Sequence, residues 1–176
     1  MAVTIIATVA GSTSNCYITA ADADAYFADT LQEDEWQGYA VDDRARALIQ
    51  ATRQIEGLRL AGEPEDEDQA LHFPRVGDLD DDNSYYIIPA VENACCEQAL
   101  YLLDVRANPD LLDRERLQGQ GVVSVSLDGV SETYRANADG LGPRARRLLG
   151  KLIRRTISVQ RADYDETDSD DVEWVS

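Results

Sequence analysis

The chain has 176 residues, of which 44% are hydrophobic and 28% charged, and a formal net charge of -18. This length suits one domain with a buried core and is short for two domains. The acidic excess repels phosphate backbones and argues against tight binding of nucleic acid, and no apolar run approaches the roughly 20 residues that span a bilayer.

The amino terminus and the cysteines indicate a protein of a reducing compartment. The first residues, MAVTIIATVAG, lack the basic region of a secretory signal. Cys16, Cys95 and Cys96 are odd in number and lack the spacing of a disulfide framework, and we expect the adjacent pair to be buried in a helix. We therefore expect the protein to be made in the cytoplasm.

The first third of the chain predicts a strand and two helices. The β-branched run Val3 to Val9 is typical of a short strand, and Thr19 is placed to cap a helix from Ala20 to Ala28. Trp36 lies in a short helical turn or loop and should reach the core.

A stronger helix follows, capped by Asp42 or Asp43. Its apolar positions recur at three- and four-residue steps, which predicts a buried stripe. That stripe comprises Ala45, Leu48, Ile49, Thr52 and Ile55, and the outward face carries Arg44, Arg46, Arg53 and Glu56.

Two acidic runs, at 63–68 and 78–82, are typical of solvated loops. The second resembles a calcium loop in its alternating aspartates, but Asn83 and Pro89 occupy the positions that such a loop gives to glycine and glutamate. Between the runs lies His72, the single histidine, which we expect to be half-buried beside Phe73 in a structural role.

The longest apolar periodicity runs from Pro89 to Asp104 and predicts the central helix of the domain. Pro89 suits the first helical turn, and Pro109 should close the far end. Most of this helix should be covered by other segments, because its polar positions are few.

The last third predicts a hairpin, a basic helix and an acidic tail. VVSVSL, the turn signal Asp128-Gly129 and Val130 to Tyr134 indicate a β-hairpin near 122–134. An amphipathic helix follows within 141–157, beginning at Pro143. The fold class is thus mainly α, a small helical bundle over residues 1–157 with a β-hairpin, followed by an extended, flexible tail at 158–176.

The candidate contact residues lie in these last elements. The hairpin must either pack on the helices or contact a neighbouring subunit through its edge. The basic helix and the aromatic tip of the tail suggest partner binding, and the alternative for the acidic tail is a solubilising terminus. The subunit-interface candidates are Val123, Val125, Leu127 and Tyr134, and the partner-binding candidates are Arg144, Arg146, Arg147, Lys151, Arg154, Arg155 and Trp174. No residue pattern indicates a catalytic centre, a metal site or a cofactor, so we expect a protein that is not an enzyme.

Several motifs, in one order, resemble a known family. SNCYITAADADAYFAD, RALIQATRQIEGL, DQALHFPR, IPAVENACCEQALYLL and GVVSVSLDGVSETY look like the head-tail connector proteins of tailed bacteriophages, also called adaptor or head-completion proteins. Relatives are often labelled DnaT-like single-stranded DNA-binding proteins.

The connector resemblance implies a structural virion protein of the neck between capsid and tail. It would form a homo-oligomeric, dodecameric ring below the portal protein, dock a tail or stopper (head-closure) protein, and let double-stranded DNA pass without specific binding. The alternative is a single-stranded DNA-binding replication accessory that uses the basic helix. A single-strand binder needs a basic groove with interleaved aromatics, and the basic helix has no aromatic residue, so the sequence alone favours the connector.

Overall fold

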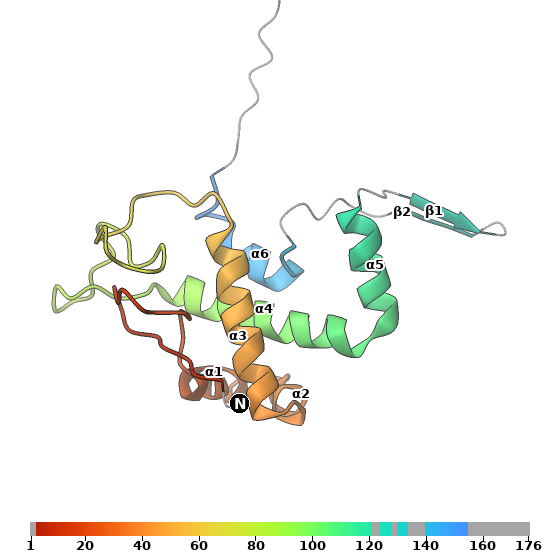
Figure 1. Ribbon diagram of the computed structural model, residues 1–176, viewed down its shortest axis with the longest axis horizontal. Helices are drawn as coiled ribbons and strands as arrows, with labels where there is room; N and C mark the ends of the chain where they lie inside the picture. Colours follow the sequence, from red (N-terminus) through yellow and green to blue (C-terminus); the bar gives the residue numbers. More distant parts are fainter. Residues whose placement is uncertain (1–2, 121–123, 128–129, 134–139, 155–176) are drawn as a thin grey trace, which may run out of the picture.

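The computed structural model describes residues 3–120, 124–127, 130–133 and 140–154. Within these ranges the chain is mainly helical, with six helices and one pair of strands (Figure 1). The helices are α1 (Ala20–Ala28), α2 (Glu33–Gly38), α3 (Val41–Glu56), α4 (Pro89–Ala107), α5 (Pro109–Gly119) and α6 (Pro143–Leu149), and the strands are β1 (Ser124–Leu127) and β2 (Val130–Thr133).

The fold is built around α4, as its apolar periodicity predicted. Helix α3 crosses α4, and α6 packs against another side of α4 (Figure 1). Val91, Cys95 and Ala99 are completely buried, and so is the polar Gln98. Because α4 is covered by helices on more than one side, it carries buried residues around much of its circumference.

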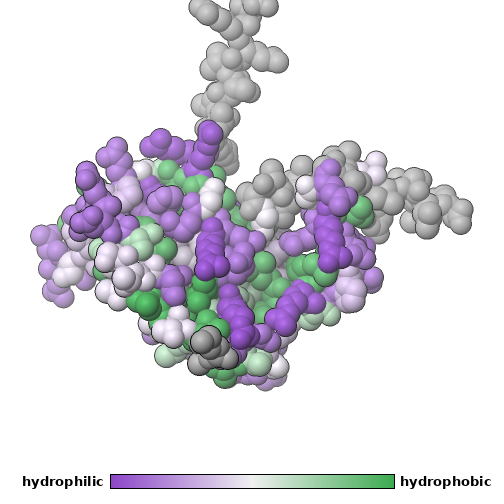
Figure 2. Space-filling view, in the orientation of Figure 1, coloured by the Kyte–Doolittle hydropathy of each residue, from purple (hydrophilic) through white to green (hydrophobic). Residues whose placement is uncertain are grey.

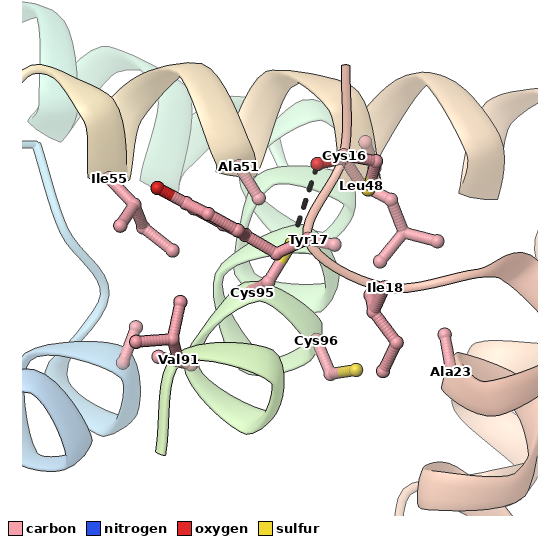
Figure 3. Packing of buried hydrophobic residues seen from close by; sticks show 14 of the residues in the cluster. Cys16, Tyr17, Ile18, Ala23, Leu48, Ala51, Ile55, Val91, Cys95 and Cys96 are labelled. Atoms are coloured by element: carbon pink, nitrogen blue, oxygen red, sulfur yellow. Dashed lines mark hydrogen bonds between the residues drawn. The ribbon is translucent and has the colours of Figure 1, made fainter. Parts of the chain in front are cut away.

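The segment before α1 fills the space between α3 and α4. Figure 3 shows Tyr17 between Ile55 of α3 and Val91 of α4. Thr52 anchors this segment, because its hydroxyl oxygen accepts the backbone N–H of Tyr17 at 3.3 Å. Burial of these side chains ties an extended amino-terminal segment to two helices that are far away in sequence.

Helices α1 and α2 form a small aromatic layer against this core. The hydroxyl oxygen of Thr19 accepts the backbone N–H of Asp22 at 3.2 Å, which confirms the predicted cap of α1. The rings of Phe27 and Trp36 stack with their centroids 4.5 Å apart. Trp36 is buried, as predicted, and its indole N–H donates to Asp24 at 2.7 Å.

Helix α3 differs from the prediction at its start and on one face. The helix begins at Val41 after Ala40, so Asp42 and Asp43 lie in its first turn and do not cap it. Arg44 was expected to face outward, but it is 9% exposed. Its guanidinium lies 2.6 Å from the carboxylate of Asp24, which explains how the charge is accommodated in this position.

The chain between 104 and 120 also differs from the prediction. Pro109 does not simply close α4, because it begins a further helix, α5, that the sequence reasoning missed. Asn108 caps α5 by accepting the backbone N–H of Asp110 at 3.1 Å. The apolar positions of α5 are half-buried at most, which left little periodic signal to detect.

The remaining predicted elements are partly within the described residues. The backbones of β1 and β2 pair antiparallel, with Leu127 opposite Val130, while the expected turn at 128–129 lies outside the described residues. No strand forms over residues 3–9, where the backbone N–H of Ile6 bonds the Asn15 side chain at 2.8 Å. Helix α6 ends at Leu149, earlier than predicted, and the tail at 158–176 lies outside the described residues.

Candidate functional site

Three segments lie side by side where α3 ends and the described chain ends (Figure 1). The backbone after α3 pairs with the backbone after α6 through an isolated antiparallel bridge between Leu60 and Ile153. A second bridge joins Pro64 to Arg75 on the other side of the same segment. These two bridges bring residues from positions near 60, 75 and 154 into one place.

The three segments enclose a pocket of about 470 Å³, which we call the arginine pocket. Its positively charged residues are Arg59, Arg75 and Arg154, and His72 also lines it. Arg59 and Arg154 are exposed to solvent, whereas Arg75 is buried. The remaining wall is formed by Leu58, Leu60, Gly62 and Pro64.

Arg75 is held in the pocket by its surroundings. It is 7% exposed, its guanidinium lies 4.8 Å from the centre of the Phe73 ring, and one terminal N–H group donates to the carbonyl of Gly62. Burial lowers the pKa of Arg75, the neighbouring charges of Asp78 and Glu56 raise it, and Arg154 lowers it. Among the residues that the structure describes, the buried Nε of Arg75 has no hydrogen-bond partner.

His72 links the pocket to the partly buried carboxylate of Glu56. Its backbone N–H donates to both carboxylate oxygens of Glu56 at 3.1 Å, and its Nδ1 lies 3.5 Å from the same carboxylate. The hydroxyl of Tyr17 donates to Glu56 as well. Burial raises the pKa of Glu56, while its hydrogen bond to His72 works in the opposite direction. The side chain of His72 is half-exposed and lines the arginine pocket. The sequence suggested only a half-buried structural role beside Phe73.

A second cavity, of about 270 Å³, lies between α2, α4 and α6, and its charged lining residues are mostly acidic. Glu35, Glu97 and Asp104 line this acidic cleft together with Arg144. Burial raises the pKa of Glu35, and the adjacent Asp104 raises it further. Arg144 lies 3.4 Å from the carboxylate of Glu97. The cleft therefore carries excess negative charge and repels phosphate.

The structure divides the basic residues that the sequence grouped together. Arg144 faces the acidic cleft, Arg146 is half-buried, and Arg147 and Lys151 are exposed. Arg154 lines the arginine pocket on a different side of α6. Arg155, Trp174, Val123 and Tyr134 lie outside the described residues, and Val125 and Leu127 are described only as backbone of β1.

Sequence reasoning missed Arg59 and Arg75 as candidate site residues. Neither belongs to a basic run, because Arg59 follows a helix and Arg75 stands between two acidic runs. The signal available was a single arginine among many acidic residues. It did not reveal that Arg75 shares a pocket with Arg154, which is 79 positions further along the chain. Figure 2 shows hydrophilic side chains gathered around the point where the described chain ends.

The described ranges contain no group of three or more His, Cys, Asp or Glu residues that could hold a metal ion. Within the same ranges, every helix is too short or too polar to cross a membrane. The three cysteines are buried and unpaired, with Cys95 and Cys96 on α4 as predicted.

Comparison with known proteins assigns the family. Residues 1–164 match the family model described as "Putative DnaT-like ssDNA binding protein". The chain belongs to this DnaT-like family. No curated protein and no solved structure matches the chain significantly.

Membership of the DnaT-like family corrects the functional interpretation made from the sequence. The head-tail connector of a phage virion is not supported, because the matching family is described by single-stranded DNA binding, which was the alternative. The expectation of weak affinity for nucleic acid rested on the net charge of -18, but salt screens charges beyond about 8 Å at physiological ionic strength, so that total does not describe the field near a local group of cations. The dodecameric ring, the portal and tail partners and the location in the virion neck were implied by the connector resemblance and remain untested.

Proposed function

We propose that this protein binds single-stranded DNA through the basic surface formed by Arg147, Lys151 and Arg154. The observation that carries this proposal is membership of the DnaT-like family over residues 1–164. All three side chains are exposed, and they follow one another along the end of α6 and the turn after it. Contacts of such cations with phosphates supply most of the affinity in sequence-independent binding.

The surrounding charges define where a strand can run. The loop between α3 and α4 carries the acidic runs at 63–68 and 78–82, and the acidic cleft is lined by the first residues of α6, at the other end of the helix from Lys151 and Arg154. Both regions repel a phosphate backbone, so a strand should favour the surface of Arg147, Lys151 and Arg154. Helix α6 offers no aromatic side chain for stacking, and binding should depend on phosphate contacts.

A fluorescence anisotropy titration with a labelled oligothymidylate tests the proposal. Three phosphate contacts to a single strand predict a slope of log Kobs against log salt of about -2, since each contact contributes about -0.7. Double-stranded DNA of the same length serves as the competitor that distinguishes strand preference from general charge attraction.

A charge-reversal variant tests the surface itself. Arg147→Glu combined with Lys151→Glu should reduce the affinity by more than about tenfold, because two attractive contacts become repulsive. The matched control is Arg116→Glu with Arg114→Glu on α5, which changes the net charge by the same amount away from the basic surface. Equal losses in both double variants, or no oligonucleotide binding at low salt, would contradict the proposal.

A further inference from the structure

The arginine pocket contains a buried cation that the described residues satisfy only in part. Arg75 is 7% exposed, and its Nε has no hydrogen-bond partner among the described residues although the atom is shielded from solvent. A buried polar group without a partner costs on the order of 1–3 kcal/mol, and more when it is charged. In native proteins such groups are usually paired with protein, with water or with a ligand.

The backbone around the pocket keeps Arg75 close to other cations. Arg154 is near enough to lower the pKa of Arg75, and its backbone N–H is fixed to the carbonyl of Arg59 at 2.8 Å. Gly62 allows the close approach of the chain, since it has a φ of +89° and a Cβ there would lie 3.2 Å from Cδ of Arg75. Three guanidinium groups thus line one cavity at the expense of mutual repulsion.

Two carboxylates oppose these cations without closing the pocket. Glu56 is engaged by Tyr17 and by the backbone of His72, and Asp78 accepts the backbone N–H of Arg75 at 2.8 Å. Neither carboxylate is among the residues that line the cavity. An anion in the cavity therefore meets the arginines directly.

We propose that the arginine pocket binds a phosphate group. Guanidinium groups present paired N–H donors that match phosphate oxygens, and such charge-assisted hydrogen bonds are among the strongest in proteins. A volume of about 470 Å³ also leaves room for the sugar to which a phosphate is attached. The phosphate belongs either to a DNA strand or to free inorganic phosphate. Binding of a DNA strand in the pocket rests on the proposed function, whereas binding of the free anion does not.

Inorganic phosphate alone is the first probe, used with the full chain. Thermal unfolding is measured over a phosphate series, with chloride at matched ionic strength as the reference. Binding to the folded state should give a saturable rise in Tm that follows the ratio of phosphate concentration to Kd. The absence of a phosphate-specific rise would overturn the proposal.

Variants of the exposed arginines connect this effect to the pocket. Arg59→Gln and Arg154→Gln should each weaken phosphate binding about tenfold or more, the equivalent of one charge-assisted hydrogen bond. Both side chains are exposed, so these variants should fold, in contrast to changes at the buried Arg75. The matched control is Arg116→Gln on α5, where an exposed arginine lies 3.3 Å from Asp113. Equal phosphate binding in all three variants would place the anion elsewhere and overturn the site.

Oligonucleotides then identify the source. Tighter binding of a 5′-phosphorylated oligothymidylate than of its 5′-hydroxyl counterpart, abolished by Arg59→Gln, indicates a strand end. Equal binding of both strands that is weakened by Arg59→Gln indicates an internal phosphate, and either result supports the pocket. Phosphate binding without oligonucleotide binding supports the pocket and overturns the proposed function. Oligonucleotide binding that Arg59→Gln leaves unchanged overturns DNA as the ligand of the pocket, because Arg59 lines the pocket and is not part of the basic surface of the proposed function.

Discussion

Gln98 joins α6 to the central helix, and replacing it by alanine tests this connection. The side chain is fully buried. Its Nε2 donates to Oε1 of Gln54 at 2.8 Å and to the carbonyl of Gly140 at 3.2 Å, and its Oε1 accepts the N–H of Gly142 at 2.7 Å. Gly142 immediately precedes the first residue of α6. These hydrogen bonds help to fix the start of α6, in addition to the packing of α6 against α4.

The expected loss follows from those three hydrogen bonds. Each contributes about 1 kcal/mol, and the variant Gln98→Ala also leaves the buried N–H of Gly142 without a partner, so the free energy of unfolding should fall by about 3 kcal/mol or more. For a chain of this length that corresponds to a decrease in Tm of about 6–12 °C.

Urea unfolding followed by circular dichroism measures the change. Gln50→Ala is the matched control, because Gln50 is an exposed glutamine on α3 and its replacement should change stability by less than about 0.5 kcal/mol. A loss below about 1 kcal/mol in Gln98→Ala would refute the reasoning, since it would mean that the three hydrogen bonds do not hold α6 in place.

Three further changes test other parts of the fold. Arg44→Met should lower the free energy of unfolding by about 1–3 kcal/mol, measured in urea, because it removes the guanidinium 2.6 Å from Asp24. Arg46→Met removes a half-exposed arginine and should lower it by less than about 1 kcal/mol. Equal losses in the two variants would contradict the argument from burial. Burial raises the pKa of Glu56 above 4.5, so folding favours the protonated form of this side chain. The stability of the natural chain relative to Glu56→Gln should therefore decline as pH rises above 4.5 through the raised pKa. Urea unfolding over a pH series measures this difference, and a constant or growing difference would contradict the prediction. Asn108→Ala should lower the free energy of unfolding by about 1 kcal/mol, because it removes the side chain that caps α5. Backbone amide hydrogens of α5 should then exchange faster with solvent. Unchanged exchange in α5 would show that Asn108 does not stabilise the start of this helix.

The net charge of the whole chain does not describe the charge of its local surfaces. The chain as a whole is strongly acidic, yet the described part of it concentrates cations where α3 and α6 end. The field that a ligand meets is set within about 8 Å at physiological salt, so a total over 176 residues says little about any one surface.

The sequence by itself determined the helices whose periodicity or caps are local. Thr19 marks the start of α1, Pro89 the start of α4, and the apolar steps along α4 identify the central helix. These features depend on interactions between residues three or four positions apart, which any reader of the chain can find. Helix α5 was not predicted, because its residues are half-buried at most and its apolar periodicity is correspondingly weak.

Only the tertiary structure decided the candidate site. Arg59, Arg75 and Arg154 come together through two isolated backbone bridges, and neither bridge has a local sequence signal. Packing between the helices likewise places Arg144 of α6 next to Glu97 of α4 and buries Arg44 of α3 beside Asp24 of α1. Contacts of this kind depend on how segments that are distant in sequence meet in space. The charge pattern along the chain grouped the arginines in and after α6, but it could not show which of them line the same pocket.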